Sequence, residues 1–367
     1  DENTAVGLNA LTTDTFGSKS TAIGRAALAN QNFGTATDTF NTAVGYFAGV
    51  NVTTGKSNTF LGANAALAIN SGESNVAVGT NALKTATGDT ETVAVGVQAL
   101  ENQNKNGTAS NTAVGFRAGR DTTTGTSNTF IGAEAGLTVT TGTGQTAVGR
   151  GALAAQAGSD NTAIGNYALN AATGANNTAV GQVAGFAVTS GGNNLLLGKD
   201  AGRTGSPGGN ITTESNNVVL GDDNIQFIFA QVQVISSSDA RDKTDFNDLD
   251  LGLDFVKGLS PVTYKWDKRS KYGDKTADDY DLEAQTPDGT HKEDWLDIGF
   301  KAQEVIALEE AAGYKISDKT NLVSNLTQDG KQYGLQYENF VPILVKAIQE
   351  QDAIIQSLTA RITALES

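Results

Sequence analysis

The amino-acid sequence predicts a mainly β protein, a parallel β-solenoid followed by a smaller α+β module and a C-terminal helix. A phrase of the type Asn-Thr-Ala-Val-Gly recurs thirteen times between residues 3 and 221, usually 17 residues apart. Glycine and charge change abruptly near residue 235, and the last residues carry an apolar heptad pattern. A period this short indicates a stacked array of small units and not a globule around one core.

The columns of the repeat predict how its strands face. The residue before Gly is aliphatic in all thirteen units, and two residues earlier Thr stands in nine of them. Positions two apart share one face of a strand. The column between them is mostly Ala, with exceptions such as Phe60, Phe130 and Leu196. We therefore expect strands that are buried on both faces. The aliphatic face expected to be buried throughout carries Val6, Val44, Val78 and Val114.

Three further columns predict how the units stack. Asn leads ten units, for example Asn41 and Asn58, and stacked amides are expected to bond from one rung to the next. The closing Gly marks a turn or a close approach of backbones. Ala follows three residues later in twelve units. The Thr-, Gly- and Ser-rich remainder of each unit is either a second short strand or a wide turn.

Composition divides the chain. Residues 1–235 carry 25 charged side chains and the remaining 132 residues carry 40, and both tryptophans lie in the second part. Residues 224–235 alternate between apolar and polar side chains, which is typical of a strand. The predicted units are a solenoid over 1–223, a connecting strand over 224–237, a folded module over 238–340 and a helix over 341–367.

Several classes of function are disfavoured. The net charge of −15 argues against nucleic-acid and anionic-membrane partners, and no apolar run is long enough for a bilayer. The chain has no Cys and one histidine, His291, expected in a solvated loop, so we predict no metal site and no cofactor. The Asp222-Asp223-Asn224 cluster favours a turn over a calcium site. The sequence begins in mid-repeat without Met, so we expect a fragment of a longer protein.

The repeat phrase resembles the head repeat of trimeric autotransporter adhesins, a left-handed parallel β-roll, and the similar shafts of phage tail fibres. The resemblance covers residues 1–221 and implies a homotrimer. This chain differs in its longer units and in Thr where those heads prefer Ser. The alternative is an unrelated Gly- and Thr-rich parallel solenoid.

Four blocks in the second part carry another resemblance. They lie at residues 236–243, 259–266, 298–305 and 333–344. In this order they resemble the intramolecular chaperone domain of endosialidase-type phage tailspikes and fibres, over residues 236–350. The resemblance implies a module that brings three chains together and helps them to fold.

The same resemblance implies a self-cleaving serine peptidase with no external substrate. Ser238 would be the nucleophile, Lys243 its base, and the Ser238–Asp239 bond the cleavage site, with Arg241 also in place. A hydroxyl is a poor nucleophile until a base activates it, and a lysine acts as base only when burial or nearby cations disfavour its charged form.

One departure from that pattern bears on the dyad. Asp242 stands where the family usually has an apolar residue, and Asp245 follows nearby. Carboxylates close to Lys243 favour its charged form. The alternative is that Ser238 caps a turn and that Lys243 pairs with Asp242 or Asp245.

The last segment predicts a coiled-coil helix. Pro342 suits a first helical turn, and apolar side chains follow at alternating spacings of four and three. Ile at the a positions and Leu at the d positions by themselves favour a two-stranded coiled coil, whereas the resemblance implies a three-stranded one. The alternative is a lone helix that packs its apolar stripe on its own domain. The predicted seam consists of Leu344, Ile348, Gln351, Ile355, Leu358, Ile362 and Leu365.

These observations favour the distal part of a homotrimeric tail fibre or tailspike in a virion tail, which attaches to a host-surface receptor such as a glycan. The alternatives are a bacterial cell-surface adhesin fibre with the same chaperone and a module that trimerises without cleaving. An ice-binding solenoid is disfavoured, because the column beside the Thr column is aliphatic. A polysaccharide depolymerase is disfavoured by the lack of recurring paired carboxylates in residues 1–235.

Overall fold

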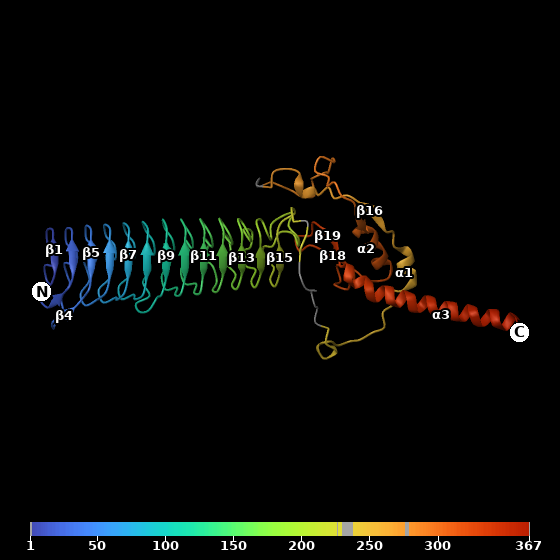
Figure 1. The fold of residues 1–367 in the computed structure, drawn as a ribbon, viewed down its shortest axis with the longest axis horizontal. Coiled ribbons are helices and arrows are strands. Elements are labelled where there is room, and N and C mark those ends of the chain that lie inside the picture. The colour runs from blue at the N-terminus through green and yellow to red at the C-terminus, as the bar shows by residue number, and fades with distance from the viewer. Residues whose placement is uncertain (1, 226, 230–237, 276–278, 367) are drawn as a thin grey trace. The chain divides into compact units, whose positions relative to one another are not determined.

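A computed structural model describes residues 2–225, 227–229, 238–275 and 279–366 of the chain. They form two compact units, residues 1–224 and residues 225–367. The first is a parallel β-solenoid, and the second holds short helices and strands followed by one long helix (Figure 1). The predicted order of a solenoid, an α+β module and a terminal helix is confirmed.

The solenoid is built on one sheet of thirteen parallel strands, one from each repeat unit. The strands pair in register, so that Thr112 lies opposite Thr129 and Val114 opposite Ile131. Between them the chain runs mostly through turns, and a second pair of parallel strands, β2 (Gly17–Ser18) and β4 (Thr37–Asp38), forms only near the N-terminus. The strands of the main sheet are β1 (Thr4–Val6), β3 (Thr21–Ile23), β5 (Thr42–Val44), β6 (Thr59–Leu61), β7 (Val76–Val78), β8 (Val93–Val95), β9 (Thr112–Val114), β10 (Thr129–Ile131), β11 (Thr146–Val148), β12 (Thr162–Ile164), β13 (Thr178–Val180), β14 (Leu195–Leu197) and β15 (Val218–Leu220).

The single chain buries only one of the two strand faces. In the single chain Val6 is 56% exposed and Val114 is 38% exposed, while Val44 and Val78 are half-buried. The Ala column, by contrast, is buried in every strand from β3 to β13 that carries it. Side chains alternate along a strand, so only one of the two columns can face the interior of a coil. The interior is narrow, and the small column is the one that fits.

Large side chains in the inward column are matched by glycines. Phe130 is fully buried, and a Cβ at Gly119 or at Gly136 would lie 2.6 or 2.3 Å from its ring. Phe60 has the same relation to Gly49, at 2.6 Å. Other coils have Leu at the position equivalent to Gly119 and Ala in the inward column of the strand. The side chains at these two positions together therefore keep the volume of the core nearly constant.

The predicted Asn ladder is present and buried. The Asn58 side chain donates to the Gly72 carbonyl at 2.9 Å, and its Oδ1 accepts from the backbone N–H of Asn75 at 3.0 Å. Each amide thus bonds the turn of its own coil and the next rung. Because these buried groups are satisfied only when the coils are in register, the ladder favours one stacking over its alternatives.

Three rungs lack Asn: Gln145 takes its place in one, where it accepts from the Asn161 backbone N–H, and the other two are completed from another position. Ser20 and Thr92 stand in the ladder column, and in each case a buried glutamine 11 residues later in the same coil enters the core beside them. Gln31 donates to the Ser20 hydroxyl at 3.0 Å, and Gln103 donates to the Thr92 hydroxyl at 3.1 Å. Where the small side chain leaves space, the glutamine supplies the missing amide.

Glycine is required at the closing position of each unit because the backbones of neighbouring coils approach closely there. Gly96 has φ +139, and a Cβ there would lie 2.2 Å from the carbonyl oxygen of Gly115 in the next coil. The other inner rungs show the same contact, so a side chain at this column would push neighbouring coils apart. The predicted close approach of backbones is confirmed.

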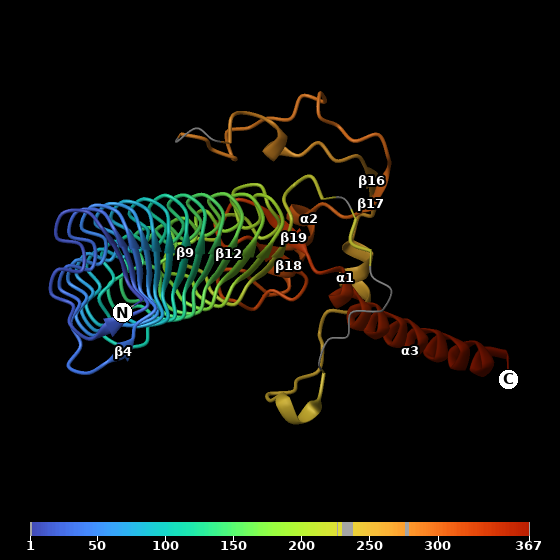
Figure 2. The ribbon, with the colours of Figure 1, turned by 60° about the vertical axis from the view of Figure 1, so that its left-hand side comes forward.

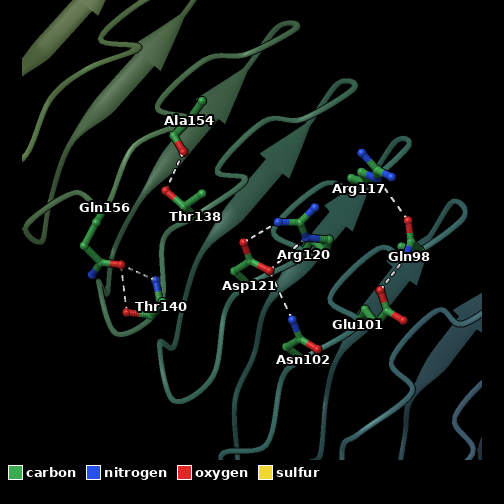
Figure 3. Close-up of polar contacts among 10 residues, drawn as sticks. All are labelled: Gln98, Glu101, Asn102, Arg117, Arg120, Asp121, Thr138, Thr140, Ala154 and Gln156. Carbon is green, nitrogen blue, oxygen red and sulfur yellow. Dashed lines mark hydrogen bonds and ion pairs between the residues drawn. The ribbon is translucent and has the colours of Figure 1, made fainter.

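Side chains at the turns also join neighbouring coils (Figure 3). The Thr138 hydroxyl donates to the Ala154 carbonyl at 2.8 Å. Asn102 donates to Asp121 at 3.1 Å, and Asp121 forms an ion pair with Arg120 at 2.6 Å. These contacts repeat the coil-to-coil spacing of the sheet on the surface of the solenoid.

The described residues of the second unit form two antiparallel pairs of strands and three α-helices. Strand β16 (Val262–Tyr264) pairs antiparallel with β17 (Asp297–Gly299), and β18 (Ser324–Leu326) pairs with β19 (Tyr333–Leu335). The helices are α1 (Leu253–Gly258), α2 (Ala302–Ala311) and α3 (Phe340–Glu366). A small core joins α1, α2 and the start of α3 through Leu251, Phe255, Val305, Val323, Phe340 and Ile343.

Helix α2 is also joined to β18 by hydrogen bonds. The buried Glu309 carboxylate accepts hydrogen bonds from three backbone N–H groups, those of Leu322, Val323 and Ser324, at 2.7–3.0 Å, and so ties α2 to β18.

A connecting strand was predicted over residues 224–237. Residues 224, 225 and 227–229 form no strand, and the other positions lie outside the described residues.

Candidate functional site

A short turn organises the predicted cleavage site. Residues Ala240–Asp242 form a single 3-10 turn, and the Asp239 side chain caps it by accepting from the Arg241 backbone N–H at 2.9 Å. The turn ends at Lys243, whose backbone N–H donates to the Ala240 carbonyl at 3.3 Å. This reversal brings the residues on either side of the turn together.

The two predicted dyad residues are in contact. The Lys243 Nζ donates to the Ser238 Oγ at 2.6 Å, across five residues of sequence. Both residues are exposed in the single chain. An amine hydrogen-bonded to a hydroxyl is the arrangement from which a neutral lysine can remove the hydroxyl proton.

Arg241 lies on the other side of the turn and binds Asp239. Its Nη2 lies 2.6 Å from Asp239 Oδ2, and its Nε also donates to that carboxylate. The guanidinium lowers the pKa of Asp239 below its usual range. Arg241 therefore holds the residue that follows the predicted cleavage bond through both carboxylate oxygens.

The aspartates that could compete for Lys243 are not paired with it. Among the described residues, no ion pair within 4 Å joins Lys243 to Asp242 or Asp245, and the side chain that caps the turn belongs to Asp239. The alternative in which Ser238 caps a turn and Lys243 pairs with a carboxylate is not the arrangement in this structure.

The predicted helical seam is exposed. All seven of its positions lie on α3, and Ile355 is 53% exposed and Leu358 48% exposed. The residues by which α3 packs on its own module are others, namely Phe340, Ile343 and Ala347. Beyond them α3 continues as one unbroken helix (Figure 2). The alternative, that the seam itself packs on its own domain, is not seen.

The remaining candidates carry no site. The backbone N–H of Asn224 donates to the Asp222 carboxylate at 2.9 Å, which is a turn of the expected kind. His291 is exposed, with its ring against Tyr272. Among the described residues, no cluster of His, Asp or Glu could hold a metal ion. None of the helices in the described part of the chain is both long enough and apolar enough to span a membrane.

The second unit also contains an aromatic cavity that the sequence analysis did not predict. It has a volume of about 500 Å³, and its lining includes Phe227, Trp266 and Trp295. Lys268 and Glu293 form a partly buried ion pair at its edge, 3.6 Å apart. The only available signal was that these are the two tryptophans of the chain.

A comparison with known families identifies part of the second unit. Residues 238–314 match the family described as Peptidase_S74, chaperone of endosialidase. The matched segment begins at Ser238 and ends just beyond α2. Searches of curated proteins and of solved structures found no match. The chain therefore contains a chaperone-of-endosialidase domain that follows a β-solenoid, and this domain implies a role in trimer formation and folding.

Proposed function

We propose that this chain is the distal part of a homotrimeric phage tail fibre or tailspike in the virion tail, and that it attaches to a receptor on the host surface, such as a glycan. One observation carries the proposal: a chaperone-of-endosialidase domain directly follows a solenoid of thirteen near-identical rungs. A bacterial cell-surface fibre with the same chaperone is the alternative setting.

The solenoid creates the need for a chaperone. Its strands repeat nearly the same three residues, so a slip by one whole unit exchanges one rung for a similar one at little cost in free energy. Parallel strand pairing is also slow and exposed to aggregation. A C-terminal module that joins three chains first aligns the last rungs, and the stacking then proceeds away from it.

Cleavage after assembly makes the process irreversible. Removing residues 239–367 would release the module that catalysed folding, and the fibre would then be stable because its unfolding is slow. Attack by the Ser238 Oγ on its own carbonyl carbon would close a strained β-lactone. In this proposal the dyad therefore activates a water molecule, or the Oγ of one copy attacks a neighbouring copy.

A module that trimerises without cleaving is the second candidate. The observation that favours it is the exposure of Lys243 in the single chain, next to Asp242. A lysine acts as a base when it is desolvated. In the first candidate, the desolvation comes from assembly of the three modules.

Expression of residues 1–224 beside the full chain tests the chaperone role. The full chain is expected to give trimers by light scattering, and residues 1–224 alone are expected to give aggregates or unfolded monomers. Recovery of folded trimers from residues 1–224 at the yield of the full chain would contradict the proposal.

A further inference from the structure

The coils between residues 149 and 203 carry exposed polar side chains at a position that is mostly apolar in the coils before them. In four earlier consecutive coils the residue after the closing glycine is Thr80, Val97, Phe116 or Ala133. In the next four coils it is Arg150, Asn166, Gln182 or Lys199, and these four residues are exposed. Repeat units that are otherwise alike therefore differ here in the chemistry of one surface column.

The backbone stacks these four residues in a row. The Arg150 carbonyl accepts from the Tyr167 N–H at 2.9 Å, and the Asn166 carbonyl accepts from the Val183 N–H at 2.9 Å. The Gln182 carbonyl accepts from the N–H of the residue after Lys199 at 3.0 Å. Each bond joins one coil to the next, so the row has one side chain per rung. At about 4.8 Å per rung, its two ends are roughly 14 Å apart.

Two aromatic rings lie beside this row, between two arginines. The Arg150 guanidinium lies over the Tyr167 ring, 5.6 Å from its centre, and the Arg203 guanidinium lies over the Phe186 ring at 5.4 Å. The two rings meet edge to face, with their centres 6.5 Å apart. Four consecutive coils thus supply an arginine, a ring, a second ring and a second arginine.

The Tyr167 ring is held in place by the preceding coil. A Cβ at Gly151 would lie 2.5 Å from this ring, so the ring occupies the space that a side chain at position 151 would need. The Asn170 amide also donates to the Gly151 carbonyl, at 2.8 Å. Because the ring is already fixed, a ligand that packs on it loses little affinity to the ordering of the side chain.

The row and its rings are positively charged in a chain whose net charge is −15. Lys199 and Arg203 lie 3.4 and 2.8 Å from the same carboxylate, that of Asp200. Among the described residues Arg150 forms no ion pair within 4 Å. Three cations and one carboxylate leave an excess of positive charge that fits an anionic ligand, whereas a second copy of the chain would oppose it with the same charges.

We propose that this surface binds an acidic polysaccharide laid along the solenoid. The inference rests on the proposed attachment to a host-surface glycan, and it adds the place on the chain and the class of glycan. The surface is called the strip below and consists of Arg150, Asn166, Tyr167, Gln182, Phe186 and Arg203.

Each part of the strip matches one part of such a ligand. Aromatic rings pack against the C–H faces of sugar rings, and the two amides hydrogen-bond to sugar hydroxyls. A guanidinium binds a carboxylate or a phosphate through two parallel hydrogen bonds. Since the arginines stand at the two ends of the strip, the ligand carries acidic groups at intervals along its chain. Nucleic acid fits less well, because its affinity depends on many phosphate contacts.

Calorimetric titration of the full chain with sodium polygalacturonate, a carboxylated sugar chain, tests the strip. A phosphorylated mannan is titrated in parallel, and the tighter of the two acidic saccharides shows whether carboxylate or phosphate is the acidic group. Dextran offers sugar rings without acid, and polyglutamate offers carboxylates without sugar rings. Both are expected to bind about tenfold or more weakly than the preferred acidic saccharide, because each lacks one of the two kinds of contact.

Two variants remove one kind of contact each. Arg150→Gln is expected to raise the Kd about tenfold or more, because a hydrogen bond to a charged group is lost. Tyr167→Val removes the ring and is expected to raise the Kd roughly fivefold. Valine is tolerated there, since Val183 stands at the equivalent position of the next coil. Lys56→Gln, which removes one cation elsewhere on the solenoid, is the matched control and is expected to leave the Kd unchanged.

The outcomes separate this inference from the proposal beneath it. A monomer by light scattering would contradict the homotrimer and leave the strip standing, because its residues all come from one chain. Binding that neither Arg150→Gln nor Tyr167→Val weakens would place the glycan elsewhere, so that attachment stands and the strip does not. Polyglutamate bound as tightly as polygalacturonate and the mannan would show an anion site that does not recognise sugar. Failure of both acidic saccharides to bind would also overturn the inference.

Discussion

The Nε2 of Gln103 donates to the Thr92 hydroxyl at 3.1 Å, and its Oε1 accepts from Asn111 at 2.8 Å. Gln103 thus joins two rungs of the buried ladder at the point where one of them lacks its asparagine. Gln31 makes the equivalent pair of bonds, to Ser20 and from Asn41. Both glutamines occupy the core column that Val52 and Ile69 fill in ordinary coils.

Gln103→Val is expected to reduce the free energy of unfolding by about 1–3 kcal/mol, because it removes one hydrogen-bond partner from each of the buried Thr92 and Asn111 side chains. The double variant Thr92→Asn with Gln103→Val restores an ordinary rung and is expected to recover most of the loss. Denaturant unfolding of the three proteins measures the effect. A double variant no more stable than Gln103→Val would show that the pair is not exchangeable with an asparagine rung.

Gly96→Ala is expected to lower stability by at least ~2 kcal/mol, because the residue has a positive φ and its new Cβ would clash with the Gly115 carbonyl. Gly34→Ala is the matched control, since a Cβ there meets nothing within 4 Å. Thermal unfolding compares both with the parent. Equal melting temperatures for the two variants would contradict the close approach of the coils.

Asp89 gives the solenoid a predictable dependence on pH. Its carboxylate is fully buried and Oδ2 has no hydrogen-bond partner within the described residues, and this burial raises its pKa. A raised pKa in the folded state means that the folded form holds the proton more tightly. The stability that this gives is complete below the ordinary pKa of an aspartate and is lost as pH rises through the raised value.

The free energy of unfolding of Asp89→Asn is compared with that of the parent at each pH. The difference is expected to favour the variant more at pH 7 than at pH 4. Asp121→Asn is the control of opposite sign, because the neighbouring Arg120 lowers the pKa of Asp121. Its disadvantage relative to the parent should be larger at pH 7. Unfolding curves at the two pH values decide both signs, and a pH-independent Asp89→Asn difference would refute the assignment.

The exposed seam of α3 predicts where the modules join. Ile355→Asp would bury an unpaired carboxylate in each chain at a cost on the order of several kcal/mol, so trimers should be lost at low protein concentration. Ala360→Asp, on the same helix outside the seam, should leave assembly unchanged. Light scattering over a dilution series measures both. Equal trimer stability in the two variants would show that the seam is not an interface.

The dyad predicts a specific set of cleavage products. The parent, once assembled, is expected to yield slowly a fragment that begins at Asp239, whereas Ser238→Ala stays intact and Lys243→Ala is strongly slowed. Asp242→Leu should cleave faster, because a nearby carboxylate stabilises the charged form of a lysine. Intact mass spectrometry over days at neutral pH follows all four proteins.

Mixed trimers of Ser238→Ala and parent chains show which copy attacks. Cleavage of the Ser238→Ala chain only in mixed trimers would indicate a neighbouring copy's Oγ. A parent that never cleaves, with no gain from Asp242→Leu, would leave the module as a trimerisation cap that does not cleave.

The sequence by itself determined the elements that depend on local repetition. Thirteen closing glycines fixed the number of strands, and ten stacked asparagines predicted a ladder that the structure shows. The spacing of apolar residues after Pro342 predicted the terminal helix almost to the residue. These features follow from positions a few residues apart and their geometry in a strand or helix.

Only the tertiary structure decided which way the strands face. Val114 and Ala113 are both apolar, so composition could not choose between them, and the narrow interior of the coil placed Ala113 inside and left Val114 exposed. The bond from Gln103 to Thr92 joins residues 11 positions apart across one coil, and the space that Gly119 leaves for Phe130 exists only when two coils stack. Volume and hydrogen-bond partners are properties of the packed core, and a linear pattern does not record them.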